Sequence, residues 1–489
     1  MRELGSPDGR FAIASVNRSK EHRTMSEQLS ALDNAFLELE TESAHNMVGS
    51  LAIFERESDE ISFEELHARL IALIEARIHR VPRFRQRVVR APFDIVPPEW
   101  VDDAGFNIEY HVRRTALPSP GRESQLFAYL GHIMSRPLDR SKPLWEIYLV
   151  EGLEGDRGAV IQKTHHALVD GISAVDIGTV LLDFAPDAPI GTPEAWKPSP
   201  GRPLAERVLS RTFQLMTSPR RAVNAIRGAL QSPEDLASAI QERATGIGSV
   251  LRTKGGIVAP DCVLNQRIGP HRKYAGARTM LEDFKRIKNS LGGTVNDVVL
   301  AATTGGLRHF LIERGEPVAP DAFLRAMVPV SVRTDEEHLA LGNRVSAMFA
   351  TLPIGVADPV EVLEAIKSET ADLKQSHQAL GAEFLIEMSG FAPATLHALG
   401  ARMMGRGRLF NVTVSNVPGP QFQLYLLGSK LVEAFPVVPL AEGGGLSVGA
   451  TSYNGGIYFG INADPAIVPD VGIIAEGIEK SVAELLAAA

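Results

Sequence analysis

Cysteine, long apolar runs and surplus basic charge are scarce in this chain of 489 residues. Its one cysteine, Cys262, excludes a disulfide within the chain and suits a reducing compartment. No apolar stretch reaches the roughly 18 residues that a membrane-spanning helix needs. The 50 Lys and Arg side chains are outnumbered by 59 Asp and Glu, for a net charge of −9. That balance argues against a nucleic-acid-binding protein, whose surface is usually basic.

Familiar motifs of metal and nucleotide sites are also missing. There is no HExxH motif and no paired CxxC motif, so the sequence predicts no metal site. Neither a GxGxxG fingerprint nor a Walker P-loop is present. Gly445 to Gly449 fit the GxSxG pattern of serine hydrolases. However, the last histidine, His397, precedes Ser447, which contradicts the order of the α/β-hydrolase triad.

What the chain does have is a pair of adjacent histidines, His165 and His166, at a predicted strand-to-helix turn. The apolar run 158–163 predicts a strand, and apolar residues at helical spacing from Ile177 onward predict a helix. Two neighbouring side chains leave such a turn in different directions, so one can face a cleft while the other packs. A neutral imidazole is a good proton acceptor near pH 7.

The pair opens the sequence His165-His166-x-x-x-Asp170-Gly171, which matches the HHxxxDG motif of acyltransferases that use thioester donors. The aspartate can bond backbone N–H groups of the turn, and the glycine permits a positive φ. The chain resembles the bacterial wax ester synthase/diacylglycerol acyltransferase family from about Leu29 to its C-terminus. Other family-like segments are 29–37, 143–145 (PLW), 264–272, 294–301 (with NDVVLA), 329–333 and 341–346.

The resemblance implies an α/β fold with two chloramphenicol-acetyltransferase-like domains, each a mixed sheet with helices. It also implies an active-site tunnel at the domain interface. The expected organisation is a flexible extension over 1–24, an N-terminal acyltransferase domain over 25–185, a linker with basic amphipathic helices over 186–269 and a C-terminal acyltransferase domain over 270–489. We also expect Met25 to be an alternative start.

The resemblance also implies roles for the motif residues. His166 is expected to be the general base, with His165 in support. Asp170 is expected to brace the loop by pairing with an arginine, for which Arg333 is the candidate. The implied donor is acyl-CoA, with no other cofactor. The implied acceptors are diacylglycerol, which gives triacylglycerol, and a long-chain alcohol, which gives a wax ester.

Substrate contacts are expected from Gly171, Arg333, Asp297 and Trp145. Trp145 belongs to the PLW segment and is expected in the core or along an acyl channel.

Asn296 is the candidate for holding the developing oxyanion. Thr294 is predicted to cap a helix, with Asp297 at its third position, so Asn296 falls in the first turn. There a side-chain amide and free N–H groups can converge on an anion. The alternative is that Asn296 only caps the helix, and the match to the family motif favours the oxyanion role.

The segment from Arg202 to Lys254 carries nine Arg or Lys against four Asp or Glu, together with apolar residues at helical spacing. It is either a linker whose helices pack on the protein or a surface for anionic lipid. We therefore expect a cytoplasmic protein that binds a membrane or lipid-droplet surface peripherally.

Several local patterns predict secondary structure and surface positions. Residues 47–54 predict a buried strand, Ser62 the N-cap of a helix, 453–461 a hairpin and 471–486 a final helix. Alternating residues 106–112 predict a strand with His111 at its surface. The arginines at 83, 85, 87 and 90 are either a solvated face or a patch for phosphate, and the former is favoured.

Two other functions remain open. A condensation-like or polyketide-associated acyltransferase would take its acyl group from a carrier protein. A lipid-binding protein on the same fold would not catalyse transfer, although the intact HHxxxDG motif argues against that reading.

Overall fold

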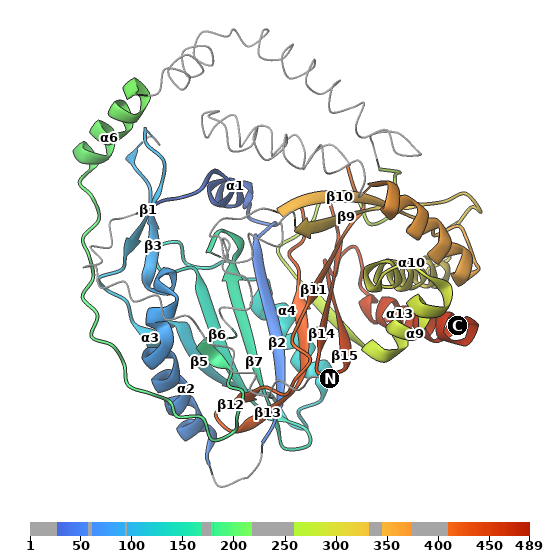
Figure 1. The fold of residues 1–489 in the computed structure, drawn as a ribbon, viewed down its shortest axis with the longest axis horizontal. Helices are drawn as coiled ribbons and strands as arrows, with labels where there is room; N and C mark the ends of the chain where they lie inside the picture. Colours follow the sequence, from blue (N-terminus) through green and yellow to red (C-terminus); the bar gives the residue numbers. More distant parts are fainter. Residues whose placement is uncertain are drawn as a thin grey trace, which may run out of the picture.

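Two mixed sheets and their helices make up most of the computed structural model, which describes residues 27–56, 61–92, 95–168, 178, 180–217, 259–331, 345–373 and 409–489 (Figure 1). Each large sheet has six strands, and a third sheet has three. Each six-stranded sheet has its own hydrophobic core. The α/β class with mixed sheets is as expected from the sequence.

The first sheet carries the histidine pair. Its neighbouring strands are antiparallel except for the last pair, which is parallel. In order across the sheet they are β12 (Tyr425–Leu426), β13 (Ser429–Val437), β2 (Met47–Glu55), β7 (Arg157–His165), β6 (Trp145–Leu153) and β5 (Val112–Ala116).

The second sheet is parallel at its centre and antiparallel towards both edges. Its order is β10 (Val345–Leu352), β9 (Leu324–Ser331), β11 (Val412–Pro418), β14 (Leu446–Tyr453), β15 (Gly456–Ala463) and β8 (Lys273–Met280). Beside it lie α9 (Leu281–Leu291), α10 (Val295–Glu313) and α13 (Val471–Ala488) (Figure 1).

Helices α10 and α13 cross at very short range because glycines face each other. A Cβ atom added to Gly477 of α13 would lie 2.9 Å from the Cα atom of Gly306 in α10. A side chain at either position would force the helices apart. The close crossing keeps α10, whose first turn carries Asn296, firmly on the second sheet.

Smaller elements complete the first half of the chain. They are β1 (Glu27–Gln28), α1 (Ala31–Leu39), α2 (Phe63–Arg77), the 3₁₀ turns η1 (Ile78–Arg80) and η2 (Pro82–Arg85), β3 (Gln86–Val89), β4 (Glu99–Asp102), α3 (Ile108–His111), α4 (Glu123–Met134), η4 (His166–Leu168) and α6 (Leu204–Thr217). The three-stranded sheet has the order β1-β4-β3. Within the described ranges, no helix is long and apolar enough to cross a membrane.

Strand β13 comes from the C-terminal half of the chain but belongs to the first sheet. It pairs with β2 from Lys430 opposite Glu55 to Val437 opposite Gly49. Its Phe435 is fully buried in the core of the first sheet. The expected domain bounds stay a prediction. A cut at the 186–269 segment would not separate the two sheets, because β13 lies beyond it in the chain.

Four local predictions are confirmed. The strand predicted at 47–54 is β2, and the final helix is α13. Ser62 caps α2, with its Oγ accepting a hydrogen bond from the Glu65 N–H at 3.1 Å. The hairpin joins β14 to β15 through Asn454 and Gly455, both at positive φ. These features depend on contacts between residues close in sequence.

The strand predicted at 106–112 is wrong, because residues Ile108–His111 form the short helix α3. His111 is buried and not a surface residue. Its ring stacks on Trp145 with centroids 4.5 Å apart, and its Nδ1 lies 2.7 Å from the Trp145 carbonyl oxygen. The alternation of polar and apolar residues predicted a strand, but the side chain of Asn107 caps a helical turn at this position.

The arginine-rich stretch after α2 lies against the protein, so these arginines are neither the solvated face that the sequence favoured nor a free cationic patch. Arg83 pairs with Glu27 at 2.7 Å, and Arg90 pairs with Glu38 at 2.5 Å. Arg85 lies over the ring of Trp196, 4.5 Å from its centroid. These contacts give no support to a phosphate patch.

The start of the basic 202–254 segment is anchored to the three-stranded sheet. Arg202 and Arg207 both pair with Glu99 of β4, which is 1% exposed. Arg207 is itself buried and donates to the Pro97 carbonyl oxygen at 2.9 Å. These two cations therefore bind the protein, as expected of the linker alternative rather than of a lipid-facing patch. Residues 218–258 lie outside the described ranges.

Candidate active site

The two histidines at the end of β7 differ in their surroundings. The main-chain N–H of His165 donates to the Leu144 carbonyl oxygen at 3.0 Å, and that of His166 donates to the Asn46 carbonyl oxygen at 2.8 Å. His165 is buried, whereas His166, in the following 3₁₀ turn, stays partly exposed. This difference follows from their adjacent positions at a strand end.

His166 packs against α1, which lies across the ends of β2 and β7 (Figure 1). Its ring stacks on Phe36 with centroids 3.9 Å apart and an interplanar angle of 22°. The Asn46 side chain donates to the Phe36 carbonyl oxygen at 2.7 Å, which ties α1 to the start of β2. The imidazole is therefore stacked on a helix that is itself hydrogen-bonded to the start of β2.

The protonation of His166 suits a general base. Its Nδ1 is buried with no hydrogen-bond partner among the described residues, whereas Nε2 is not enclosed. Burial lowers the pKa of His166 to about 4, although its own backbone carbonyl acts in the opposite direction. The ring is therefore neutral at pH 7, with Nε2 accessible to a hydroxyl group.

Both ring nitrogens of His165 are enclosed by the protein, and Nδ1 accepts a hydrogen bond. The Ala167 N–H donates to Nδ1 at 3.0 Å, so Nδ1 is an acceptor and the ring proton sits on Nε2. That Nε2 lies 3.5 Å from Oε2 of Glu40. His165 is therefore oriented from both sides, and His166 is the member of the pair that can accept a substrate proton.

Glu40, directly after α1, is a site residue that sequence reasoning missed. Its carboxylate binds the guanidinium of Arg140, whose Nε lies 3.0 Å from Oε2, and it lies 3.9 Å from Nδ1 of His45. Burial alone would raise the pKa of Glu40, but the contacts with His165 and Arg140 lower it to about 2. An acid at the negative end of a helix is unfavourable by itself. The place of Glu40 in the sequence, directly after a helix, is therefore the signal that its carboxylate needs cationic or hydrogen-bond-donor partners.

Asn296 lies in the first turn of α10, as predicted, and is partly exposed. Its Oδ1 accepts from the Asn416 side chain of β11 at 3.5 Å, a long hydrogen bond. This contact orients the Asn296 amide so that its N–H donors point away from Asn416. No hydrogen bond among the described residues links Asn296 to His166.

Asp297 is occupied by helix capping. One oxygen accepts from the N–H and hydroxyl of Thr294, both at 2.8 Å, and the other accepts from the Thr370 hydroxyl at 2.8 Å. Asp297 is 3% exposed. These contacts lend no support to the expected contact between Asp297 and substrate.

Trp145 is fully buried in the core of the first sheet. Its Nε1 donates to the Phe84 carbonyl oxygen at 2.8 Å, and its ring stacks between Phe84 and His111. This environment favours the core reading of Trp145 over the acyl channel. The remaining expected site residues, Asp170, Gly171 and Arg333, lie outside the described ranges.

Neither candidate side-chain nucleophile is activated. Burial raises the pKa of Cys262, and its thiol donates to Oδ1 of Asn265 at 3.0 Å. Ser447 lies within β14 rather than at a strand-to-helix elbow, and its hydroxyl donates to the Val438 carbonyl oxygen at 2.8 Å. A covalent acyl-enzyme therefore has no candidate at these positions.

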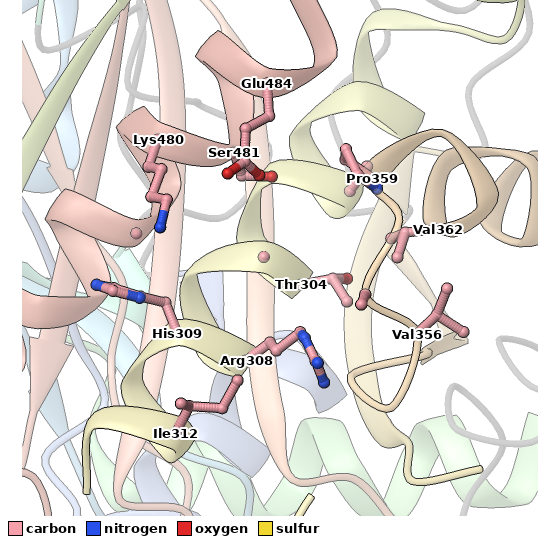
Figure 2. A pocket seen from close by; sticks show the side chains of 14 residues that line it. Thr304, Arg308, His309, Ile312, Val356, Pro359, Val362, Lys480, Ser481 and Glu484 are labelled. Carbon is pink, nitrogen blue, oxygen red and sulfur yellow. The ribbon is translucent and has the colours of Figure 1, made fainter. Parts of the chain in front are cut away.

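A pocket of about 160 Å³ lies elsewhere, between α10, α13 and the segment around Val356 (Figure 2). Figure 2 shows Arg308 and His309 on one helix and Lys480 on the other. Arg308 is already bound to the Ile354 carbonyl oxygen at 2.7 Å. The histidine pair is not among its lining residues, so this pocket is separate from the candidate site.

Comparison with known proteins gives the same picture over most of the chain. Residues 29–299 match the model of the wax ester synthase/diacylglycerol acyltransferase catalytic domain, and residues 341–486 match that of the WS/DGAT C-terminal domain. A putative diacylglycerol O-acyltransferase of Mycobacterium tuberculosis is 32% identical over 473 residues, which span 94% of this chain and 90% of that protein.

Solved structures extend the comparison to the fold. The wax ester synthase/diacylglycerol acyltransferase of Marinobacter aquaeolei VT8 superposes with a TM-score of 0.68 at 27% identity, over 94% of this chain and 98% of that one. The starter condensation domain of rhizomide synthetase has a TM-score of 0.54 at 14% identity, over 95% of this chain and 96% of that one, and shares the fold alone. The chain belongs to the wax ester synthase/diacylglycerol acyltransferase family.

Proposed function

We propose that this protein is an O-acyltransferase that moves a long-chain acyl group from acyl-CoA to diacylglycerol, to a long-chain alcohol, or to both. The observation that carries the proposal is the state of His166 in a chain of this family. Its ring is neutral at pH 7, held against Phe36, and has one nitrogen accessible. A base in this state can deprotonate a hydroxyl group without first losing a proton to solvent.

Transfer then proceeds by direct attack. Nε2 of His166 takes the proton of the acceptor hydroxyl as its oxygen bonds to the thioester carbonyl carbon. The resulting oxyanion is held by donors that include the Asn296 amide. Collapse breaks the carbon–sulfur bond, and the leaving CoA thiolate takes the proton from the His166 imidazolium. The products are an ester and free CoA, and the step needs no cofactor besides the co-substrate.

The catalytic test is His166→Ala. We expect transfer to fall by about 10² to 10⁴-fold in a folded protein, the range typical of a positioned general base. Product analysis should use palmitoyl-CoA with diacylglycerol and with hexadecanol, and an acyl-carrier protein as alternative donor. Near-normal turnover in the folded variant would reject His166 as the base, and transfer only from the carrier protein would favour a condensation-like enzyme.

The protein is also proposed to act in the cytoplasm at a membrane or lipid-droplet surface, where its acceptors are found. Support comes from α6, in which Leu209 is 70% exposed and Leu204 is 39% exposed. Figure 1 shows this helix at the edge of the molecule, away from the second sheet. Exposed apolar side chains on a helix with basic neighbours in the sequence are typical of an interfacial helix.

A further inference from the structure

We propose that Glu40 is a positioning residue for the acyl transfer, because it orients His165 and through it the backbone that presents His166. The proposal rests on the proposed function of the histidine pair. Its starting point is the contact between Glu40 Oε2 and His165 Nε2 at 3.5 Å, between two side chains that are 9% and 1% exposed. Neither side chain has bulk water as an alternative partner.

The geometry fixes which nitrogen of His165 carries the proton. Because Nδ1 accepts from the Ala167 N–H, the proton of the neutral ring is on Nε2, which lies 3.5 Å from Glu40 Oε2 in an electrostatic contact rather than a hydrogen bond. A flip of the ring would turn both nitrogens away from their partners. The carboxylate and the backbone N–H therefore select one tautomer and one rotamer of His165 together.

Glu40 is itself held in place, so it can act as a fixed reference. Arg140 binds its carboxylate and also donates to the Leu37 carbonyl oxygen of α1 at 2.9 Å. Glu40 thus stays with α1, the helix whose Phe36 stacks on His166. His45 faces the other carboxylate oxygen at 3.9 Å, and the carboxylate is the anion that these three side chains share.

The coupling to His166 runs through the main chain. The hydrogen bond from the Ala167 N–H to the His165 side chain closes a ring that contains the whole backbone of His166. Displacement of the His165 ring would therefore release or shift that backbone. A general base shifted by about 1 Å can lose up to 10²-fold in rate, because proton transfer depends on a near-attack geometry.

The first measurement compares Glu40→Gln with Glu38→Gln. Glutamine keeps the size of residue 40 but removes its charge, and Arg140 tolerates the change because its side chain is 45% exposed. We expect kcat to fall about ten-fold with KM for both substrates within two-fold. Glu38→Gln breaks a similar ion pair from the same helix, with Arg90, and is expected to leave kcat unchanged. Glu40→Asp, which keeps the charge, should recover part of the loss.

The second measurement tests whether Glu40 acts through His165. His165→Asn keeps an acceptor near the Ala167 N–H but removes the group that faces Glu40. In that background Glu40→Gln should lower kcat by less than two-fold, because the contact is already lost. An equal loss of kcat in both backgrounds would overturn the proposal, as would a change in KM alone or a kcat unaffected by Glu40→Gln.

The outcome separates this proposal from the proposed function. If the unmodified protein transfers acyl groups and His166→Ala does not, the function stands whatever Glu40 does. If the unmodified protein shows no transfer, the same pair can be followed by ¹⁵N-histidine NMR. Glu40→Gln should then change the His165 imidazole signals, and unchanged signals would reject the contact itself.

Discussion

At the scale of single residues, the surroundings decide which of two identical side chains does the chemistry. His165 and His166 are neighbours on the same turn, yet His165 is buried with Nδ1 bonded to a backbone N–H, whereas His166 has Nε2 accessible. The pKa of His166 is lowered because its charged form would lose contact with water. Burial and hydrogen bonding therefore decide which of the two histidines can act as the base.

The lowered pKa of His166 predicts an unusual pH profile. The neutral ring is the active base, and a folded-state pKa of about 4 keeps it neutral down to weakly acidic pH. We expect kcat/KM to be flat from about pH 6 to 8 and to fall only as the pH approaches 4. Glu40 does not change charge in this window, because its pKa is about 2. Circular dichroism at each pH checks folding, and a midpoint near 6.5 would contradict the lowered pKa of His166.

Asn296→Ala tests the oxyanion role. Loss of one fixed donor typically costs about 10²–10³ in turnover, whereas the neutral ground-state carbonyl gains less from it. We therefore expect kcat to fall by that factor with KM within a few-fold. Asn416→Ala, which frees the Asn296 amide to rotate, should give a smaller loss. A rise in KM alone would make Asn296 a binding residue and leave the oxyanion to other donors.

At the scale of elements, caps and anchors decide where the site residues are presented. The first turn of α10 is held by a reciprocal cap in which Thr294 and Asp297 satisfy each other's backbone N–H groups. The start of α6 is held by two arginines on one buried glutamate. Each anchor uses a charged group where apolar packing alone would leave backbone donors or cations without partners.

Asp297→Ala should destabilise the protein rather than weaken substrate binding. Removal of the cap typically costs about 1–2 kcal/mol, and the buried Thr370 hydroxyl keeps only its longer hydrogen bond, to the Lys367 carbonyl oxygen at 3.3 Å. Urea denaturation should show the loss, with KM for acyl-CoA unchanged. Asp283→Ala, which removes an acid from the first turn of α9, is the control and should cost less. A higher KM without destabilisation would restore Asp297 as a substrate contact.

The exposed face of α6 should contribute to lipid binding. Leu204→Ser with Leu209→Ser removes apolar area that can be buried in an interface, at about 25 cal/mol per Å². We expect weaker flotation with vesicles that contain anionic lipid. Ile312→Ser, at a residue 48% exposed on α10, is the control and should bind as the unmodified protein does. Equal flotation of all three proteins would remove α6 as the contact surface.

At the scale of the whole molecule, the two sheets depend on each other. Strand β13 comes from the second half of the chain, lies between β12 and β2 in the first sheet, and is followed in sequence by β14 of the second sheet. Tyr274 of β8 also reaches this strand, with its hydroxyl donating to the Pro436 carbonyl oxygen at 2.8 Å. The first sheet therefore contains strands from both halves of the chain, and the halves are not structurally independent.

Separate expression of the halves tests this dependence. A 25–269 fragment would leave the edge of β2 unpaired and its core without Phe435, so we expect aggregation or a non-cooperative melt. Co-expression with a 270–489 fragment should yield a complex that co-purifies. A 25–269 fragment that is monomeric and melts cooperatively by itself would show that β13 is dispensable.

What the sequence by itself determined is local. The strand–turn that carries His165 and His166, the cap of α10 by Thr294 and the turn at Asn454 all arise between residues a few positions apart. For these, periodicity and side-chain chemistry suffice. The one local failure, at 106–112, came from a polar cap that imitates strand alternation.

Only the tertiary structure decided which distant groups meet. Glu40 reaches His165 across 125 positions of the sequence, and Asn416 reaches Asn296 across 120. Strand β13 enters the first sheet because one edge of β2 needs a partner, and several strands of this chain have a similar pattern of apolar residues. Pattern can show that a strand or an acid needs a partner, but burial and packing choose the partner, because they depend on the whole fold.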